Sequence, residues 1–202
     1  MIEINNVSKS FEDKPLFANL NLKVEKGEFV IFSGPSGCGK TTLLNMIGAI
    51  EPIDNGEILV DNLNIQKRKN QLHYFKFKLG LLFQNFALVE NKTVKENLNF
   101  VRKECRSGVS IEQALEWVGL ADKLNKKIYT LSGGEQQRVA LSRLMIKKCD
   151  IILADEPTGS LDSKNAEVVL DIIKQFHTQG KTVIMVTHDE EIKMRGERII
   201  HL

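Results

Sequence analysis

The sequence predicts an α/β fold with a parallel-sheet core, an N-terminal antiparallel β part and an inserted α-helical part. Two observations predict this class. Short apolar runs alternate with helical patterns, which is typical of parallel strands joined by crossover helices. Gly34, Gln84, Asp155 and His188 each follow closely on such an apolar run. Ligands of open parallel sheets bind where the strands end, so we expect these four residues at one edge of the sheet.

The phosphate-binding pattern G-x-x-x-x-G-K-[ST] occurs within residues 33–42. An apolar run at 28–32 precedes it, and residues 41–47 have apolar side chains at helical spacing, so a chance glycine-rich turn is a poor alternative. Backbone N–H groups of such a loop bind phosphate oxygens. We expect Lys40 to contact the β- and γ-phosphates and Thr41 to bind Mg²⁺. The nucleotide-binding residues predicted from this loop are Gly34, Pro35, Ser36, Gly37, Cys38, Gly39, Lys40, Thr41 and Thr42.

Composition narrows the class of protein. The 202 residues are 42% apolar and 27% charged, which suits a globular domain. A formal net charge of +2 gives no electrostatic argument for nucleic acid, and no nucleic-acid partner is expected. Three cysteines are too few for a disulfide framework, so a reducing cytosol is the expected compartment. No signal peptide or membrane-spanning run is recognisable, so a membrane role would depend on a partner.

The N-terminal third combines two kinds of strand. Residues 1–4, 16–24 and 57–60 predict strands of an antiparallel part, around the strand that leads into the phosphate loop. Phe11 lies among polar residues that predict a loop. It is a candidate for stacking on an adenine ring, and its alternative is a loop anchor.

The remainder predicts a helical insertion and the rest of the sheet. Ile111, Ala114 and Leu115 share one helical face, and Trp117 beside them is predicted to lie in the core. A helix is expected to begin at Asp162-Ser163. Strands are predicted at 79–83, 151–154, 182–186 and 197–202. We expect one domain, 1–202, in which 1–84 and 149–202 form the core with its antiparallel part and 85–148 form the helical subdomain.

Two adjacent carboxylates follow the apolar run 151–154. Asp155 is placed to hold Mg²⁺, and Glu156 is placed to polarise the water that attacks the γ-phosphate. The alternative is an exposed acidic turn before a proline. Gln84 is a candidate for contact with the metal or the attacking water, and His188 for contact with the γ-phosphate. The alternative for Gln84 is an ordinary polar surface residue, and the alternative for His188 is a structural histidine.

A second anion site is predicted where Ser132, Gly133 and Gly134 open a helix. It lies in the helical part, away in sequence from the phosphate loop. One interpretation is that it serves a nucleotide held by another copy of the chain.

In this order and spacing, the motifs resemble the nucleotide-binding subunits of ATP-binding-cassette (ABC) transporters over essentially the whole chain. The matching parts are the phosphate loop at 34–42, the glutamine loop at Gln84, the signature at 131–135, the metal-binding strand and catalytic glutamate at 151–156, the dimer-contacting loop at 160–162, the switch histidine at His188 and the adenine-stacking aromatic at Phe11. One departure is Glu135, where many family members carry glutamine.

The resemblance implies a RecA-like core and an ATPase that works as a head-to-tail dimer. Each ATP would lie between Lys40 of one copy and Ser132 and Gly134 of the other, closing the dimer until hydrolysis reopens it. Gly133 and Asp162 are also implied at the nucleotide, and Thr41, Gln84 and Asp155 at Mg²⁺. The implied location is the cytoplasmic face of the membrane, on a transmembrane permease.

Residues 34–37, 153–162 and 186–189 resemble the branch that exports lipoproteins, macrolides and antimicrobial peptides, and 43–51 resemble its bacteriocin-exporting members. The permease would contact the surface after Gln84, where Phe86, Leu88 and Val89 offer either a docking patch or packing for the helical part.

Export through a separate permease is thus the leading function. The alternative is a regulatory ABC ATPase that switches a membrane or cell-wall partner without transport. A soluble ABC protein acting on ribosomes or chromosomes is disfavoured, because such chains usually carry two cassettes or a long coiled coil. A simple kinase is disfavoured by the second anion site.

Overall fold

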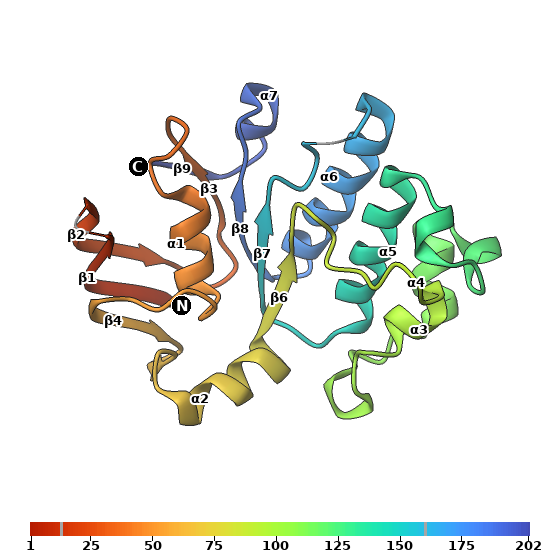
Figure 1. The fold of residues 1–202 in the computed structure, drawn as a ribbon, viewed down its shortest axis with the longest axis horizontal. Helices are drawn as coiled ribbons and strands as arrows, with labels where there is room; N and C mark the ends of the chain where they lie inside the picture. Colours follow the sequence, from red (N-terminus) through yellow and green to blue (C-terminus); the bar gives the residue numbers. More distant parts are fainter. Residues whose placement is uncertain (13, 160) are drawn as a thin grey trace.

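A computed structural model describes residues 1–12, 14–159 and 161–202 (Figure 1). An antiparallel sheet contains β1 (Ile2–Phe11), β2 (Lys14–Val24), β4 (Asn55–Val60) and β5 (Leu63–Asn64), in the order β2-β1-β4-β5. A parallel sheet contains β3 (Phe29–Ser33), β6 (Leu79–Leu82), β7 (Ile151–Asp155), β8 (Thr182–Val186) and β9 (Arg198–His201), in the order β6-β7-β8-β3-β9. The predicted α/β fold class is confirmed.

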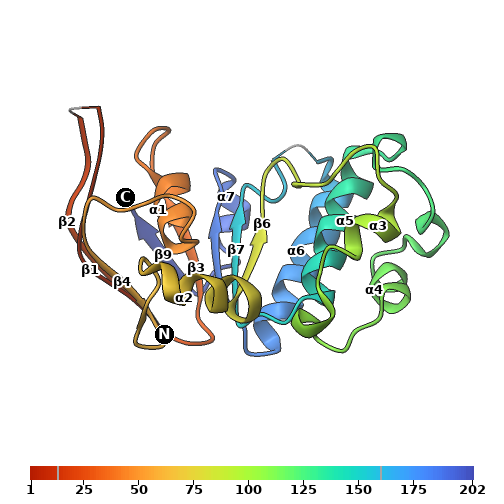
Figure 2. The same ribbon diagram turned by 60° about the horizontal axis from the view of Figure 1, so that its bottom comes forward.

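Helices cover both faces of the parallel sheet. The helices of the described residues are α1 (Lys40–Ile47), α2 (Arg68–His73), α3 (Val94–Leu98), α4 (Ile111–Trp117), α5 (Gly133–Ile146), α6 (Ser163–Thr178) and α7 (Glu190–Lys193). A π-helical turn, η1 (Tyr74–Lys78), extends α2, and 3₁₀ turns are η2 (Lys103–Cys105), η3 (Ala121–Lys123) and η4 (Ile128–Thr130). Figures 1 and 2 show α1 between the two sheets, and α5 and α6 on the opposite face of the parallel sheet.

The parallel strands are continuous apolar runs because both of their faces are covered. Every residue of β3 and β8 is buried, and they pair in register from Phe29 with Val183 to Phe32 with Val186. Alternate side chains of a strand point to opposite faces. Accordingly Phe29 and Ile31 join one hydrophobic cluster, whereas Val30 and Phe32 join another.

These two clusters divide the molecule between them. The first packs the helices α3 to α6 on one face of the parallel sheet, through residues such as Val139 of α5 and Ile173 of α6. The second packs α1 between the other face and the antiparallel sheet, through Leu43 and Ile58. The strand that carries the phosphate loop therefore lies between both cores. The predicted division into 1–84 plus 149–202 and 85–148 stays a prediction.

Local sequence signals explain where several helices begin. Thr93, Ser110 and Ser132 precede α3, α4 and α5, and each forms a capping box with the Glu or Gln three residues later. Asp162 caps α6 by accepting the Asn165 N–H at 2.9 Å. The predicted helix start at Asp162-Ser163 is therefore confirmed.

Two placements predicted from the sequence are wrong. Trp117 is 61% exposed. The buried side chains of α4 are Ile111, Ala114 and Leu115, and the helical repeat places Trp117 on a different face from them. Phe11 ends β1 rather than lying in a loop. This strand continues well beyond residue 4 because it pairs with both β2 and β4.

Among the helices of the described residues, none has the length and apolar character needed to cross a membrane.

Candidate functional site

The phosphate-loop sequence joins β3 to α1 at the carboxyl edge of the parallel sheet. Gly39 occupies the N-cap position of α1 with φ 100°, a left-handed conformation that favours glycine. It supplies no side chain to cap the helix, and the first turn of α1 contains no acidic residue. The N–H groups at this helix end are therefore suited to an anion.

Close contacts explain two of the loop glycines. A Cβ atom at Gly34, where φ is 149°, would lie 2.8 Å from the Leu202 carbonyl oxygen. One at Gly39 would lie 2.6 Å from the Phe17 ring. The packing of the loop against β2 and the chain end therefore excludes side chains at both positions.

Lys40 directs its ammonium back across the loop. Its Nζ donates hydrogen bonds to the backbone oxygens of Gly34 at 2.9 Å and Pro35 at 2.8 Å, and the residue is 5% exposed. Cys38 Sγ lies 3.8 Å from the same nitrogen. Both oxygens that accept from the Lys40 ammonium are neutral backbone carbonyls. No anionic side chain of the loop takes part in these hydrogen bonds.

One cavity of about 320 Å³ brings together three parts of the predicted site. Phe11 comes from β1, and His188 comes from the segment after β8. The loop and α1 contribute Ser36, Gly37, Gly39, Lys40, Thr41 and Thr42, whereas the predicted residues Gly34, Pro35 and Cys38 do not line this cavity. Leu16 of β2 also lines the cavity, a contribution that the sequence analysis missed. Its only signal was its place at the start of the strand predicted at 16–24, shortly after Phe11.

The predicted Mg²⁺ ligands also meet. The Thr41 hydroxyl donates to Asp155 Oδ1 at 3.1 Å, and Gln84 lines a second cavity, of about 300 Å³, together with Asp155. A hydroxyl, an amide oxygen and one carboxylate fit Mg²⁺, which takes oxygen ligands and usually completes its shell with water and phosphate. The described residues contain no cluster of three His, Cys, Asp or Glu side chains suited to a metal. Burial raises the pKa of Asp155.

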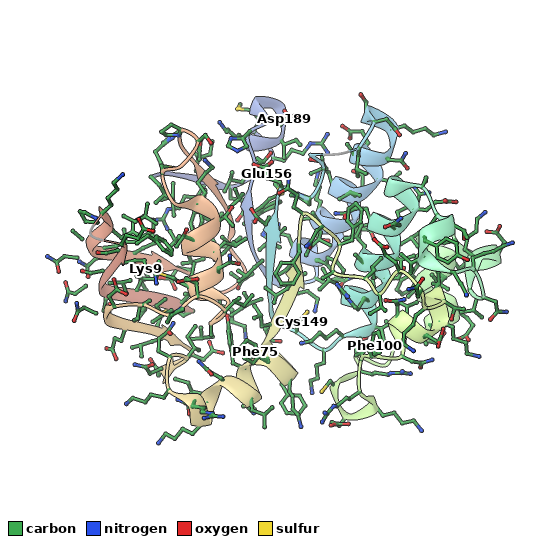
Figure 3. The ribbon with its side chains drawn as sticks, in the orientation of Figure 1. Lys9, Phe75, Phe100, Cys149, Glu156 and Asp189 are labelled. Carbon is green, nitrogen blue, oxygen red and sulfur yellow. The ribbon has the colours of Figure 1, made fainter. Side chains whose placement is uncertain are left out.

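Glu156 lies beside Asp155 at the carboxyl end of β7 (Figure 3). Its φ is 45°, an uncommon conformation for a residue with a side chain. The carboxylate Oε1 is 3.1 Å from Nε2 of His188. Burial raises the pKa of Glu156, and the charge of Asp155 adds to that rise. The arrangement thus places a carboxylate of increased basicity next to a histidine that lines the cavity.

Ser132, Gly133 and Gly134 open α5 on the other side of the sheet from the phosphate loop (Figure 1). Ser132 Oγ accepts the Glu135 N–H at 3.3 Å, and Glu135 Oε2 accepts the Ser132 N–H at 2.8 Å. This capping box gives Glu135 a structural role, and the Ser132 N–H lowers its pKa. The two cavities described above contain none of residues 132–134 in their linings.

Asp162 is likewise absent from the lining of either cavity, because its carboxylate caps α6. Its pKa is lowered by hydrogen bonds from Asn165, first among them the backbone N–H. Residue 160 of the predicted dimer-contacting loop lies outside the described residues.

The sequence profile of the ABC transporter family matches residues 17–159. The chain belongs to this family. As an ABC cassette it is an ATPase, and it binds ATP.

Relatives of this ABC cassette act in different settings. The chain is 36% identical over 209 residues to the macrolide export ATP-binding/permease protein MacB of Campylobacter jejuni, covering all of this chain and 33% of that one. It is 36% identical over 214 residues to the cell division ATP-binding protein FtsE of Mycobacterium tuberculosis, covering 100% and 92%. The cassette MJ0796 of Methanocaldococcus jannaschii, solved as a dimer in a post-hydrolysis state with ADP and Pi, superposes with a TM-score of 0.86 at 37% identity, covering 100% of this chain and 94% of that one.

Proposed function

We propose that this chain hydrolyses MgATP at the edge formed by β3, β6, β7 and β8, and that it powers export through a separate membrane permease. The observation that carries the ATPase chemistry is the cavity that joins Phe11, the phosphate loop and His188. It supports a nucleotide that lies with its base at Phe11 and its phosphates along the loop from Gly34 to Thr42.

Each polar residue then has a role that its surroundings support. Lys40 exchanges its carbonyl contacts for phosphate oxygens, since charge-assisted bonds are the stronger ones. Thr41, Asp155 and Gln84 hold Mg²⁺, which neutralises phosphate charge when bound. Glu156 accepts a proton from the attacking water, and His188 orients that carboxylate and reaches the γ-phosphate. The raised pKa of Glu156 favours the base role.

The nucleotide site is proposed to be completed by a second copy in a head-to-tail dimer. Ser132, Gly133 and Gly134 present a helix end that lies outside the cavity of their own chain. Asp162 lies at the start of α6, which packs against α5. The dimer of the relative MJ0796 supports this assembly. ATP binding closes the pair, and hydrolysis separates it.

A groove of about 390 Å³ supports docking of a permease. Apolar residues line it, including Phe75, Leu81 and the 53% exposed Phe100 (Figure 3), and cations surround them at Lys76, Arg102, Arg143 and Lys147. This chemistry suits a permease helix with an apolar face and an acidic residue. That partner would hold the cassette at the cytoplasmic face of the membrane.

The groove differs from the docking patch predicted from the sequence. Phe86 and Leu88 pack against the core cluster that contains α5, as the packing alternative expected, and Val89 is 44% exposed. Arg143 donates to the Phe86 and Ala87 carbonyls at 2.9 and 2.6 Å, which connects the segment after Gln84 to the groove. A change in the position of the segment after Gln84 on nucleotide binding would therefore be passed through Arg143 to a permease in the groove.

A regulatory ABC ATPase is the second candidate, and the similarity to FtsE favours it. The same ATP cycle would then switch a membrane or cell-wall partner without transport.

Affinity capture separates the candidates. Tagged Glu156→Gln protein is expressed in its native host, given MgATP, extracted gently from membranes and captured with its partners. A polytopic permease is the expected companion, and a Phe100→Asp version should lose it. Capture of a cell-division or cell-wall regulator instead would favour the switch. Ribosomal proteins, or no membrane protein at all, would contradict both membrane roles.

A further inference from the structure

Lys9 is a buried cation that the proposed function does not use. Its side chain is 7% exposed, and it lies on the antiparallel sheet beside α1 (Figure 3). Its Nζ is 2.6 Å from Glu51 Oε1 and 3.8 Å from Asp54 Oδ1, and it donates to the Pro52 carbonyl at 2.9 Å. A buried lysine with this many anionic and carbonyl contacts has a fixed position.

The same ammonium lies 4.8 Å from the centroid of the Phe11 ring. Lys9 and Phe11 are two residues apart on β1, so they project from the same face of the strand. The ring is 48% exposed, and it lines the cavity that contains the phosphate loop. One aromatic ring thus contacts a buried cation while it keeps open surface toward the nucleotide site.

The anions that hold Lys9 belong to the far end of the phosphate-loop helix. The turn after α1 is fixed by the Asn45 carbonyl, which accepts the N–H groups of Ile50 at 2.9 Å and Glu51 at 3.2 Å. A few residues later, Asp54 accepts the Ser10 N–H at 2.7 Å. The first turn of α1 lies at the proposed phosphate site. The loop that follows the other end of α1 therefore connects this helix to Ser10, the residue next to Phe11.

We infer that Lys9 is a positioning residue that sets the Phe11 ring for the purine base, and that Glu51 holds Lys9 in place. Two effects follow from the geometry. The ring loses rotational freedom before the base arrives, which lowers the entropic cost of stacking. The cation also draws electron density from the ring, which favours stacking against an electron-rich purine. The inference rests on the proposed site, because it concerns the base that this site would bind.

The test compares a nucleotide with the phosphate part alone. Calorimetry measures the affinities of the native chain for MgADP and magnesium pyrophosphate, and then those of Lys9→Met, Lys9→Arg and Phe11→Ala. Lys9→Met is expected to weaken MgADP about three- to tenfold and to leave pyrophosphate unchanged. Lys9→Arg keeps a cation at the ring and should restore most of the MgADP affinity. Lys23→Met is the matched control, since that lysine forms a largely exposed pair with Glu25 on β2.

A double-mutant cycle tests whether Lys9 affects MgADP affinity through the Phe11 ring. In a Phe11→Ala background, Lys9→Met should change MgADP affinity less than about twofold. Equal losses of MgADP and pyrophosphate affinity would mean a general structural role and would overturn the inference, as would full MgADP affinity in Lys9→Met. If Lys9→Met does not fold, Glu51→Gln replaces it in the test. This variant is expected to lose less MgADP affinity than Lys9→Met. Unchanged MgADP affinity in Glu51→Gln would count against the inference.

The two proposals fail in different ways. If the native chain binds neither ligand, the nucleotide site itself is misassigned, and Lys9 has nothing to position. If native affinity is present and Phe11→Ala preserves it, the site stands but the base lies elsewhere, which overturns the role of Lys9 alone.

Discussion

At the scale of single residues, the charged groups around the phosphate loop are held in contrasting ways. The Lys40 ammonium is bound by neutral backbone carbonyls, whereas Lys9 is paired with two carboxylates. Carbonyl oxygens compensate a cation less well than an anion does. Lys40 is therefore the cation with most to gain from a phosphate, although both lysines are 5% exposed.

Lys40→Ala is expected to weaken MgADP binding about 10- to 100-fold, because it removes a charge-assisted contact to the phosphates. Isothermal titration calorimetry checks this. Lys69→Ala on α2, at an exposed position, is the matched control and should bind normally. Undiminished binding by Lys40→Ala would contradict the phosphate-loop assignment.

Much of the site was predictable at this scale because its chemistry is written in short motifs. The phosphate loop, Asp155 and His188 come together at the carboxyl ends of the strands that they follow, as expected, whereas Phe11 reaches the same cavity from the antiparallel sheet. Lys9 was not predictable, since an isolated lysine in a polar segment gives no sign that its neighbours bury it. Its partners Glu51 and Asp54 are distant in sequence and approach only through the fold.

At the scale of elements, apolar periodicity determined what could be predicted. Continuous apolar runs marked β3, β7 and β8, which are buried on both faces. The segment formed by α2 and η1 has no such pattern. None of the residues of α2 is buried, and η1 contributes only Tyr74 to the interior. A single buried side chain cannot produce an apolar periodicity, so no signal for this segment is present in the sequence.

Tyr74 gives a stability prediction for that segment. Its hydroxyl donates to the Ile47 carbonyl at the end of α1 at 2.9 Å, and burial raises its pKa. Tyr74→Phe leaves the buried carbonyl unpaired, so the free energy of unfolding should fall by about 1–2 kcal/mol. Urea denaturation measures the change. Tyr129→Phe, at a residue that is 57% exposed, should leave stability within about 0.5 kcal/mol of native.

At the scale of the whole molecule, the two predicted anion sites belong to different halves of the packing. The α1 helix belongs to the cluster shared with the antiparallel sheet, whereas α5 belongs to the cluster on the opposite face. Within a single chain, residues 132–134 thus stay outside the cavity that the phosphate loop lines. In the proposed head-to-tail pair, residues 132–134 of one chain would complete the phosphate-loop site of the other.

Glu156→Gln tests that assembly directly. The amide keeps the shape of the side chain but cannot accept the proton, so turnover should fall at least about 100-fold while MgATP still binds. We expect the stalled protein to run as a dimer with MgATP and as a monomer with MgADP, by light scattering during size exclusion. Gly133→Asp in the same background should remain monomeric, because it places a carboxylate at the second anion site, where a Cβ atom meets no other atom within 4 Å in the same chain beyond its neighbours in the helix.

Hydrolysis at the native rate by Glu156→Gln would remove this residue from the base role. A stalled protein that stays monomeric with saturating MgATP would contradict the head-to-tail pair instead.

The side chains of β3 point alternately into two cores, and this limits which insertions the cassette can tolerate. Phe29 and Ile31 fill one cluster and Val30 and Phe32 the other, so slippage of this strand by one residue would exchange the side chains of both cores at once. We expect the exposed turn at Glu25 and Lys26 to accommodate an insertion, whereas a single residue added inside the buried strand would displace its side chains from both cores. Hydrophobic packing on both faces of β3 thereby fixes the point at which the phosphate loop begins.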